Sequence, residues 1–537
     1  MTQRTALLSV FDKTGIVELA RALTELGWKL VSSGGTAKVI HDAGIPVTDV
    51  AKLTGVPAIL GHRVVTLHPK VHGGILAIPT NQEHAADMKA HGIKPIQLVV
   101  GGLYPFSATV ASGASFQECI EKIDIGGPTL LRGAAKNHEF VGVVTDPSDY
   151  QTVLQDLRFN NALSEQTRQA LAIKAFAHTA RYDTDIVNWM SEGQYLGFLG
   201  ELVGDCKYGE NPYMTPAKLY QTDGLDPLAV HRFESVEGDE RSFINLTDVD
   251  CLLQAVTHLA AGYELNFGSV PYMAVGVKHG NACGAAVGSD PVEVVKRMVA
   301  GDKRAIFGGV VMTNFPITRE VAEALMECQD GDPPRLFDGV FGPSFADDAP
   351  AVLKRYQGKC RMMANPALEN IGVHSLDKAV RLRPVRGGFL TQPNYTFVLD
   401  LAARDCDVYG RAPSDQQKQD IITAWAIGCI SNSNTITLVH QGMLIGNGVG
   451  QQDRVGAAEL AIKRARDAGH NPAGAVAWSD SFFPAPDGPR ALAKAGITAI
   501  FASSGSKKDG QTIYECGKRR VSLLMQPDTK VRGFAKH

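Results

Sequence analysis

Residues 6–44, ALLSVFDKTGIVELARALTELGWKLVSSGGTAKVIHDAG, decide the fold of the first part of this chain. The apolar run at residues 6–10 predicts a buried strand, and residues 29–32 (KLVS) are predicted to form a second strand. Between them, apolar residues recur at helical spacing at Ile16, Leu19, Ala20, Leu23 and Leu26. Gly27 ends this predicted helix, and a second helix is predicted over residues 37–43.

Further strands are predicted at residues 97–100 and 140–144, and a long helix at residues 164–190. Strands that alternate with helices predict a parallel sheet with helices on both faces. Ligands of such sheets bind at the carboxyl ends of the strands. The character of the chain changes near Gly200, and a weaker break falls at residues 380–395.

Two predicted loops follow strands and precede helices: residues 12–15 (DKTG) and 32–37 (SSGGTA). This placement directs backbone amides and a helix N-terminus at a ligand, and Lys13 and Thr36 add a charge and a hydroxyl. Ordinary turn chemistry is the alternative for either loop alone. Together they favour a phosphate site.

A basic stretch lies further along at residues 63–74, RVVTLHPKVHGG. No Asp or Glu occurs between Asp49 and Glu83, and the stretch ends in a predicted Gly73-Gly74 turn. Cationic donors beside exposed backbone amides suit an anion such as phosphate. A solvated basic loop is the alternative.

Residues 123–138, IDIGGPTLLRGAAKNH, carry Asp124 and Lys136, which could act as an acid–base pair if they share one site. Alternatively, Asp124 caps a helix and Lys136 faces solvent. Tyr104, in GGLYPF, follows a predicted strand and would lie at the same rim, unless it is simply packed.

The sharpest motif of the second half is VKHGNACGAA at residues 277–286. Lys278 and His279 at a strand end offer a cation and a base to one substrate atom, although a buried His is often only structural. We interpret Cys283 as a small packed residue. No H-x-E motif with P-C-x-x-C is present, so a deaminase-type zinc site is not expected.

Composition bounds these interpretations. The 537 residues are too many for one core, so two to four domains are expected. A net charge of −3 predicts no general affinity for nucleic acid or acidic membranes. Nine cysteines without a CxxC pair indicate reduced thiols and the cytoplasm. The N-terminal residues lack the apolar run of a signal peptide.

Taken in order, these segments resemble the bifunctional family that combines phosphoribosyl-aminoimidazolecarboxamide (AICAR) formyltransferase with inosine monophosphate (IMP) cyclohydrolase. The resemblance rests on SVFDKTG, SSGGTAK, RVVTLHPKVHGGIL, LYPF, IDIGG, LLRGAAKNH, KYGENP, VKHGNACGAA, SDSFFPAPDG and VRGFAKH. It implies an α/β fold: a methylglyoxal-synthase-like parallel-sheet domain at residues 1–199 with the cyclohydrolase, then the formyltransferase at residues 200–537. The latter would comprise two cytidine-deaminase-like α/β subdomains, at about 200–385 and 386–537.

The resemblance also implies purine biosynthesis from small-molecule substrates, namely AICAR, formyl-AICAR and the formyl donor 10-formyltetrahydrofolate. It implies a homodimer with transferase sites at the subunit interface and no zinc, and it leaves a requirement for a monovalent cation open. Two alternatives stay open as well. One is a formyltransferase whose cyclohydrolase is weak or lost, and the other is a non-catalytic sensor of purine nucleotides or folate.

Residue by residue, His279 matches the family's proton acceptor and Lys278 its electrostatic stabiliser, with Asn434 in the same site. The remaining transferase positions match the family's substrate- or folate-binding positions; they are Lys207, Tyr208, Asn245, Asp338, Arg454, Phe482, Asp487 and Arg532. In the cyclohydrolase, the residues that match the family's phosphate and ribose contacts are Lys13, Ser33, Gly35, Thr36, Arg63 and Thr66. Those that match its catalytic set are Tyr104, Asp124 and Lys136.

The chain departs from the family pattern at several of these motifs. Three departures fall on the cyclohydrolase site: Val65 in place of Lys, Gly102 in place of Asn, and Phe11 in place of Ser. In the transferase half, Lys207 stands for an Arg and keeps its charge but not its bidentate fork. The Lys278–His279 pair is intact.

Overall fold

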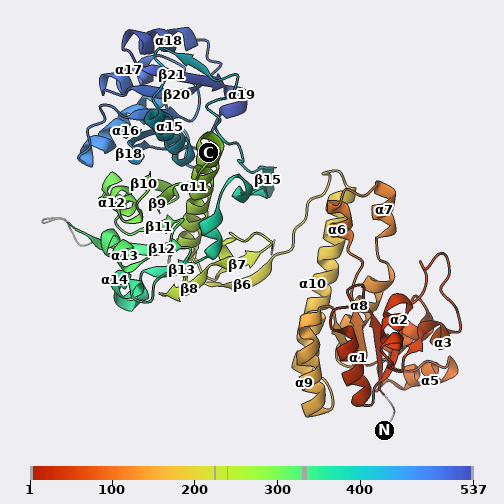
Figure 1. The fold of residues 1–537 in the computed structure, drawn as a ribbon. Helices are drawn as coiled ribbons and strands as arrows, with labels where there is room; N and C mark the ends of the chain where they lie inside the picture. The colour runs from red at the N-terminus through yellow and green to blue at the C-terminus, as the bar shows by residue number, and fades with distance from the viewer. Residues whose placement is uncertain (1–3, 223–224, 239, 329–334, 534–537) are drawn as a thin grey trace. The chain divides into compact units, whose positions relative to one another are not determined.

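The computed structural model describes residues 4–222, 225–238, 240–328 and 335–533. The chain divides into two compact units, Met1–Gly200 and Glu201–His537 (Figure 1). The last four residues of the terminal VRGFAKH motif lie outside the described residues. None of the described helices combines the length and the apolar character that crossing a membrane requires.

The first unit is built on a parallel five-stranded sheet in the order β3-β2-β1-β4-β5. Its strands are β1 (Thr5–Ser9), β2 (Lys29–Ser32), β3 (Thr48–Asp49), β4 (Leu98–Gly101) and β5 (Gly142–Val144). The predicted strands and the predicted parallel pairing are therefore confirmed. Apolar side chains of β1, β2 and β4 are almost wholly buried and form the centre of this unit's core.

Ten α-helices are described in this unit. They are α1 (Ile16–Glu25), α2 (Gly34–Asp42), α3 (Val50–Thr54), α4 (Pro69–Leu76), α5 (Gln82–Ala90), α6 (Phe106–Ala111), α7 (Phe116–Glu121), α8 (Gly126–Lys136), α9 (Tyr150–Asn160) and α10 (Glu165–Met190). The long predicted helix is α10, capped by the Ser164 side chain. It packs on α8 and β5 and so closes the first unit.

Two predicted glycine turns are helical instead. Helix α2 begins at Gly34, one residue after its N-cap Ser33, so most of the predicted SSGGT loop is the first turn of the helix. Gly73 and Gly74 lie inside α4. A Cβ at Gly74 would lie 2.5 Å from the Lys94 carbonyl oxygen, so this glycine permits close packing rather than a turn.

The second unit contains a twelve-stranded sheet in the order β16-β21-β20-β19-β17-β18-β10-β9-β11-β12-β13-β8. One half comprises β8 (Glu234–Glu237), β9 (Tyr272–Lys278), β10 (Asn281–Gly288), β11 (Gly309–Thr313), β12 (Phe337–Gly342) and β13 (Arg361–Ala364). The other comprises β16 (Asp407–Tyr409), β17 (Ile436–His440), β18 (Met443–Gly448), β19 (Val476–Ser479), β20 (Ala499–Ser504) and β21 (Ser522–Pro527).

The two halves repeat one topology. Each starts with an antiparallel hairpin, β9–β10 or β17–β18, whose first strand pairs antiparallel with the first of three mutually parallel strands. Each ends in an antiparallel edge strand, β8 or β16. The halves meet where β10 runs antiparallel to β18, with Ala286 opposite Met443.

Helices cover both faces of this sheet. Helix α11 (Phe243–Phe267) and α15 (Asp415–Gly428) share one apolar core that runs across both halves. On the other face, each half has its own core and its own helices. These are α12 (Pro291–Gly301), α13 (Arg319–Met326) and α14 (Ala349–Leu353), then α16 (Arg454–Asp467), α17 (Asp487–Lys494) and α18 (Asp509–Lys518).

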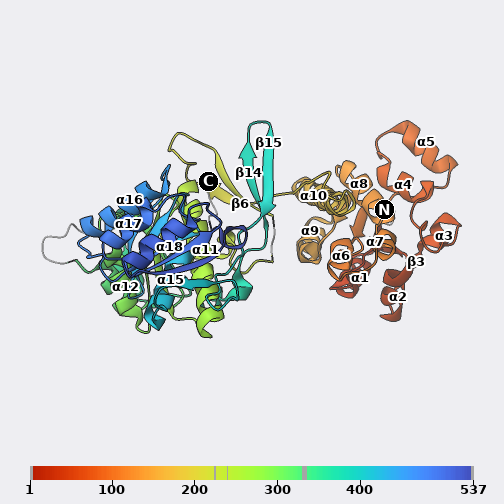
Figure 2. The same ribbon diagram turned by 90° about the horizontal axis from the view of Figure 1, so that it is seen from above.

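The remaining strands form two separate hairpins. One consists of β6 (Glu201–Cys206) and β7 (Ala217–Gln221), and the other of β14 (Val380–Val385) and β15 (Gly388–Pro393). The second hairpin spans the weaker break expected from the sequence, and Figure 2 shows it standing away from the twelve-stranded sheet. A short helix, α19 (Asp528–Val531), follows β21.

Candidate functional sites

The first candidate site begins at the carboxyl end of β1. The Thr36 hydroxyl donates to the Val10 carbonyl at 2.9 Å and accepts the Val10 amide at 3.2 Å. The Lys13 ammonium donates to the Phe11 carbonyl at 2.9 Å and also to that of Val10. Burial lowers the pKa of Lys13. The two residues that the sequence assigned to phosphate therefore meet around one strand end.

The N-terminus of α2 opens onto the same strand end. Ser33 is its N-cap, and the Ser33 hydroxyl makes no capping hydrogen bond. A Cβ at Gly34 or Gly35 would meet no heavy atom within 4 Å, so the space beside this helix end is open. A helix N-terminus with open space in front of its amides can accept an anion.

Asp124 forms a second cluster, at the N-terminus of α8. Its Oδ1 accepts the Gly127 amide at 2.8 Å. Burial raises the pKa of Asp124, and hydrogen bonds from the amides of Gly127, Tyr104 and Gly126 oppose that shift. A Cβ at Gly126 would lie 3.0 Å from Thr66 Oγ1. The structure therefore brings Asp124, Tyr104 and Thr66 together.

Phe11 joins the two clusters. Its ring meets that of Tyr104 edge to face, with centroids 5.8 Å apart, and its amide donates to the Gly102 carbonyl at 3.2 Å. Lys122 Nζ lies 5.9 Å from the centroid of the Tyr104 ring. Two of the three departures from the family pattern, Phe11 and Gly102, are thus in contact at this rim. Sequence reasoning did not identify Lys122.

Two residues that were expected in the cyclohydrolase site, Arg63 and Lys136, lie elsewhere in this unit. Arg63 forms an ion pair with the exposed Glu121 rather than approaching Lys13 or Thr36. Lys136 ends the eleven-residue helix that begins beside Asp124, so the two are separated by about 15 Å of helix. The predicted Asp124–Lys136 contact is therefore not formed within this unit.

Lys136 instead lines a separate cavity of about 370 Å³, together with His72, Arg132 and Phe176. The Arg132 guanidinium carbon lies 5.7 Å from the centroid of the Phe176 ring. Burial lowers the pKa of His72, which favours the neutral imidazole.

In the second unit, Lys278 and His279 lie at the tight turn between β9 and β10. His279 (φ 53°) and Gly280 (φ 71°) both have left-handed backbone, as a two-residue type I′ hairpin requires. Lys278 Nζ donates to the Phe307 carbonyl at 2.6 Å. Both side chains of the pair line a cavity of about 600 Å³, which also contacts Asn281, Arg304, Lys463 and Arg464.

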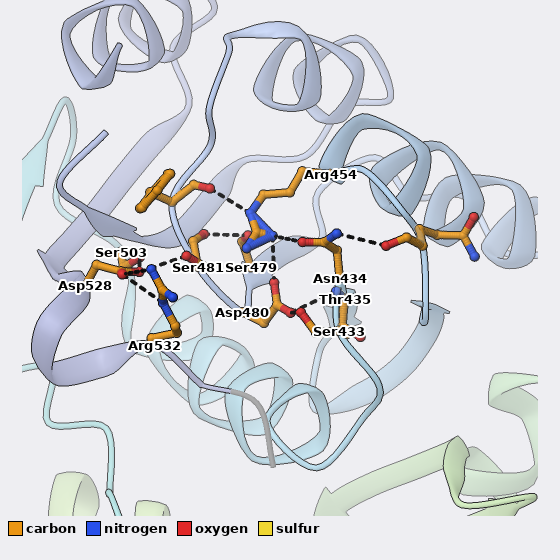
Figure 3. Close-up of polar contacts among 12 residues, drawn as sticks. Ser433, Asn434, Thr435, Arg454, Ser479, Asp480, Ser481, Ser503, Asp528 and Arg532 are labelled. Carbon is orange, nitrogen blue, oxygen red and sulfur yellow. Dashed lines mark hydrogen bonds and ion pairs between the residues drawn. The ribbon is translucent and has the colours of Figure 1, made fainter. Parts of the chain in front are cut away.

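Arg454 is the centre of a polar network next to the start of β17 and the end of β19 (Figure 3). Its Nη1 donates to Asn434 Oδ1 at 2.6 Å and to Asp480 Oδ1 at 3.0 Å, and its Nε donates to the Phe482 carbonyl at 2.6 Å. The Asn434 amide nitrogen donates to the Gln451 carbonyl at 2.8 Å. Asn434, Arg454 and Phe482, which lie far apart in the sequence, are brought together.

Asp480 anchors this network. It is fully buried, and its Oδ2 accepts the Ser433 hydroxyl at 2.6 Å and the Thr435 amide at 3.1 Å. Burial raises the pKa of Asp480, while the guanidinium of Arg454 opposes the shift. Sequence reasoning quoted the SDSFF motif but did not single out this carboxylate, because nothing local distinguishes a buried Asp from a turn Asp.

A second carboxylate, Asp528, holds Arg532 beside Phe482. Arg532 Nε donates to Asp528 Oδ2 at 2.8 Å (Figure 3). The guanidinium lies 6.0 Å from the centroid of the Phe482 ring. Asp528 Oδ1 also accepts the Ser481 hydroxyl at 2.8 Å. Although burial alone would raise the pKa of Asp528, these hydrogen bonds lower it, so the carboxylate stays ionised.

The Lys278–His279 turn and the Arg454 network lie at the same end of the strands in the middle of the sheet, because the turn follows β9 and Asn434 lies just before β17. The Asn432 amide donates to Asn281 Oδ1 at 3.4 Å, which joins the turn to the segment before Asn434. The Asn447 amide nitrogen donates to the Ala282 carbonyl at 3.1 Å and to the Ser431 hydroxyl at 3.2 Å. Contacts between the two halves of the repeat therefore hold the turn and the network together.

The other predicted transferase residues form smaller local clusters. The Lys207 amide donates to the Arg241 carbonyl, and the Phe243 amide to the Tyr208 carbonyl, so both residues lie beside the start of α11. Asn245 is part of the capping box of that helix, with its Oδ1 accepting the Ser242 hydroxyl at 2.8 Å.

Two carboxylates complete the set. Asp338 Oδ1 accepts Nη1 of Arg355 at 2.6 Å, and Asp487 is the exposed first residue of α17. Within the described parts of the chain, no group of three or more His, Cys, Asp or Glu side chains is arranged to hold a metal ion. None of the nine cysteines, all of which lie within the described residues, forms a disulfide bond.

An MGS-like parallel-sheet unit and a duplicated α/β unit, each with its own polar site, define a two-part enzyme. A family model described as MGS-like domain matches residues 15–129, and one described as AICARFT/IMPCHase bienzyme matches residues 134–464. The chain belongs to the AICARFT/IMPCHase bienzyme family.

Full-length relatives agree with this assignment. The bifunctional purine biosynthesis protein PurH of Parvibaculum lavamentivorans is 38% identical over 97% of this chain and 96% of its own. PurH of Bacillus mycoides is 38% identical over the whole of both chains. The crystal structure of ForH is 39% identical and covers 35% of this chain and 100% of its own, with a TM-score of 0.32.

Proposed function

We propose that this chain catalyses two consecutive steps of de novo purine biosynthesis. The second unit would transfer a formyl group from 10-formyltetrahydrofolate to AICAR, and the first unit would close the product to IMP. Membership of the bienzyme family supports both steps. The observation that carries the assignment is the Lys278–His279 turn, which lines a cavity of about 600 Å³ beside the Arg454–Asn434 network.

In the proposed formyl transfer, the 5-amino nitrogen of AICAR attacks the formyl carbon. His279 accepts the proton that this nitrogen loses, and the Lys278 ammonium stabilises the negative charge that develops on the formyl oxygen. The bond from the formyl carbon to N10 of the folate then breaks, and N10 takes a proton. The turn supports these roles because it places Lys278 and His279 next to one another at the wall of the same cavity.

In the proposed cyclisation, the carboxamide nitrogen of formyl-AICAR attacks the formyl carbon and a water molecule leaves. Lys13, Thr36 and the open N-terminus of α2 would hold the phosphate. Asp124 and Tyr104 would exchange protons with the reacting atoms, and the raised pKa of Asp124 suits that role. Lys136 lies at the opposite end of α8 from Asp124. It would take part in the cyclisation only in an arrangement of the chain that brings these two side chains together.

The proposal also covers the domain boundaries, the cellular compartment and the oligomeric state. We assign the cyclohydrolase to residues 1–199 and the formyltransferase to residues 200–537, with subdomains at about 200–385 and 386–537. We also propose a cytoplasmic homodimer. The nine thiols support a reducing compartment, because none of them forms a disulfide bond. Folate would serve as a co-substrate that leaves after each turnover.

A single product analysis tests the function. Incubation with AICAR and 10-formyltetrahydrofolate should release tetrahydrofolate and accumulate IMP. Release of tetrahydrofolate with formyl-AICAR as the end product would favour a formyltransferase with a lost cyclohydrolase, as the departures at Val65, Gly102 and Phe11 suggest. Binding of AICAR or folate without any product would favour a sensor.

A further inference from the structure

The turn that carries Lys278 and His279 has a counterpart in the other half of the repeat. Between β17 and β18, Gln441 (φ 52°) and Gly442 (φ 75°) adopt the same left-handed pair of conformations as His279 (φ 53°) and Gly280 (φ 71°). Two successive left-handed residues turn their backbone N–H groups toward the same side. Such a concave pair of donors binds an anion.

In both halves an aspartate of a long helix accepts backbone amide hydrogen bonds from the turn, one of them shown in the first half and two in the second. Asp248 of α11 accepts the Gly280 amide at 2.6 Å. Asp420 of α15 accepts the amides of Gln441 at 2.9 Å and Gly442 at 2.5 Å. Both aspartates are almost completely buried. A buried carboxylate that accepts backbone amides makes a charge-assisted hydrogen bond, stronger than a neutral one.

The placement of the two aspartates is also repeated. Ser242 caps α11 and Ser414 caps α15, each in a capping box, and each aspartate follows its serine by six residues. The arrangement of a capping serine, a buried aspartate and a bound turn therefore occurs in both halves of the repeat. Only in the first half does the turn bear Lys278 and His279. Substitution of the aspartate in the second half therefore measures what this arrangement contributes to folding alone.

We propose that Asp248 is a positioning residue for formyl transfer, which holds the Lys278–His279 turn in its reactive orientation. The inference rests on the proposed function of that turn. The Phe307 carbonyl fixes Lys278 Nζ at 2.6 Å, and the Cys251 thiol lies 3.3 Å from the Gly280 carbonyl. Without Asp248, the turn would lose the hydrogen bond from its Gly280 amide to α11, and the imidazole of His279 would sample other directions.

The test compares matched variants of the full-length chain: Asp248→Asn, Asp248→Ala, Asp420→Asn and Asp420→Ala. Formyl transfer is measured with AICAR and 10-formyltetrahydrofolate, and cyclisation is measured separately with formyl-AICAR. Thermal unfolding is recorded for each variant. Asp248→Asn keeps an oxygen acceptor, so it preserves a folded variant even where Asp248→Ala does not fold.

We expect Asp248→Ala to lower kcat for formyl transfer by about 50-fold or more, with KM for AICAR changed less than about threefold, because misorientation raises the barrier of the chemical step. Asp248→Asn should recover part of the loss. The Asp420 variants should lower the midpoint of thermal unfolding but keep kcat within about twofold. Cyclisation should be unchanged throughout.

Equal loss of thermal stability in both pairs, with kcat unaffected in the Asp248 variants, would overturn the proposal and leave Asp248 with a folding role only. A wild-type chain without formyl transfer would instead contradict the proposed function, so the two failures are distinguishable.

Discussion

Arg454 and Asp480 form an ion pair inside the second unit, with Nη1 of the guanidinium 3.0 Å from Oδ1 of a carboxylate that is 0% exposed. The same guanidinium nitrogen holds Asn434. Burial lowers the pKa of Arg454 and raises that of Asp480, so each charge depends on the other. One contact therefore links the stability of this unit to the shape of the proposed transferase site.

Breaking that pair should be costly. Arg454→Met leaves the Asp480 carboxylate buried without its cation, and we expect the free energy of unfolding to fall by about 3–5 kcal/mol. Arg63→Met is the matched control, because its partner Glu121 is exposed and such pairs contribute under about 1 kcal/mol. Urea denaturation measures both. An equal fall in the free energy of unfolding in the two variants would contradict the claim that burial makes the Arg454–Asp480 pair the more important one.

Acid should destabilise the first unit through Asp146. Burial alone would raise the pKa of this carboxyl, but the Ser148 amide and hydroxyl and the Lys174 ammonium, 2.9 Å away, lower it to about 2. The unfolded chain therefore takes up the proton first as the pH falls. The stabilisation is complete above about pH 5 and is lost progressively toward pH 2.

Asp146→Asn should consequently be less stable than the wild type at pH 7, and the difference should shrink as the pH is lowered from about 4 to about 2. Urea denaturation at each pH measures this. Asp87→Asn, on the exposed face of α5, is the control for the loss of a surface carboxylate. A difference that is independent of pH would show that Asp146 stabilises the unit without its charge.

Val65 offers no hydrogen-bond donor next to Thr66, where a lysine could stabilise the charge on the formyl oxygen during cyclisation. Val65→Lys should therefore raise the rate of formyl-AICAR cyclisation by about tenfold or more, since one charge-assisted hydrogen bond contributes about 1.5–3 kcal/mol. Formyl transfer should not change. Val56→Lys, at an exposed position of the same segment, should leave both rates alone.

The opposite result is equally informative. If wild-type cyclisation is already fast and Val65→Lys slows it, the chain uses another donor. Lys122 is then the side chain to substitute next, because its ammonium already lies over the Tyr104 ring.

The first unit should fold and bind ligand on its own. Residues Met1–Gly200 contain a complete parallel sheet, its core and the Lys13–Thr36 cluster. A fragment with these bounds should unfold cooperatively and bind IMP by calorimetry, with binding lost in Lys13→Ala. An insoluble fragment, or one that ignores IMP, would count against both the boundary and the site.

Local patterns predicted most of the first unit. Residues 6–10 are mostly apolar, residues 29–32 have Leu30 and Val31 at their centre, and both segments precede polar loops. That is enough to predict two strands and, from their alternation with helices, a parallel sheet. Glycine was less informative. Gly34, Gly73 and Gly74 suggested turns, but in the structure they begin a helix or let one pack against a neighbouring backbone.

The sites were only partly predictable, because their decisive contacts join distant parts of the chain. Lys278 and His279 could be recognised from one motif, but the role of Asp248 depends on a helix that lies well before them in the sequence. In the sequence, Asp480 and Asp528 look like ordinary loop carboxylates. Only the fold shows that Asp480 is fully buried and that Asp528 accepts the Ser481 hydroxyl. Lys136 matched a motif, yet the length of α8 keeps it from Asp124.

The rate of formyl transfer in His279→Ala, measured beside Gln441→Ala, tests the central claim most directly. The two residues occupy the same left-handed position of equivalent turns, so the substitutions disturb the backbone alike. Loss of a general base should lower the rate by about 10²–10⁴-fold in His279→Ala, while Gln441→Ala stays near wild type. A folded His279→Ala variant with near wild-type turnover would make His279 a structural residue and contradict the account.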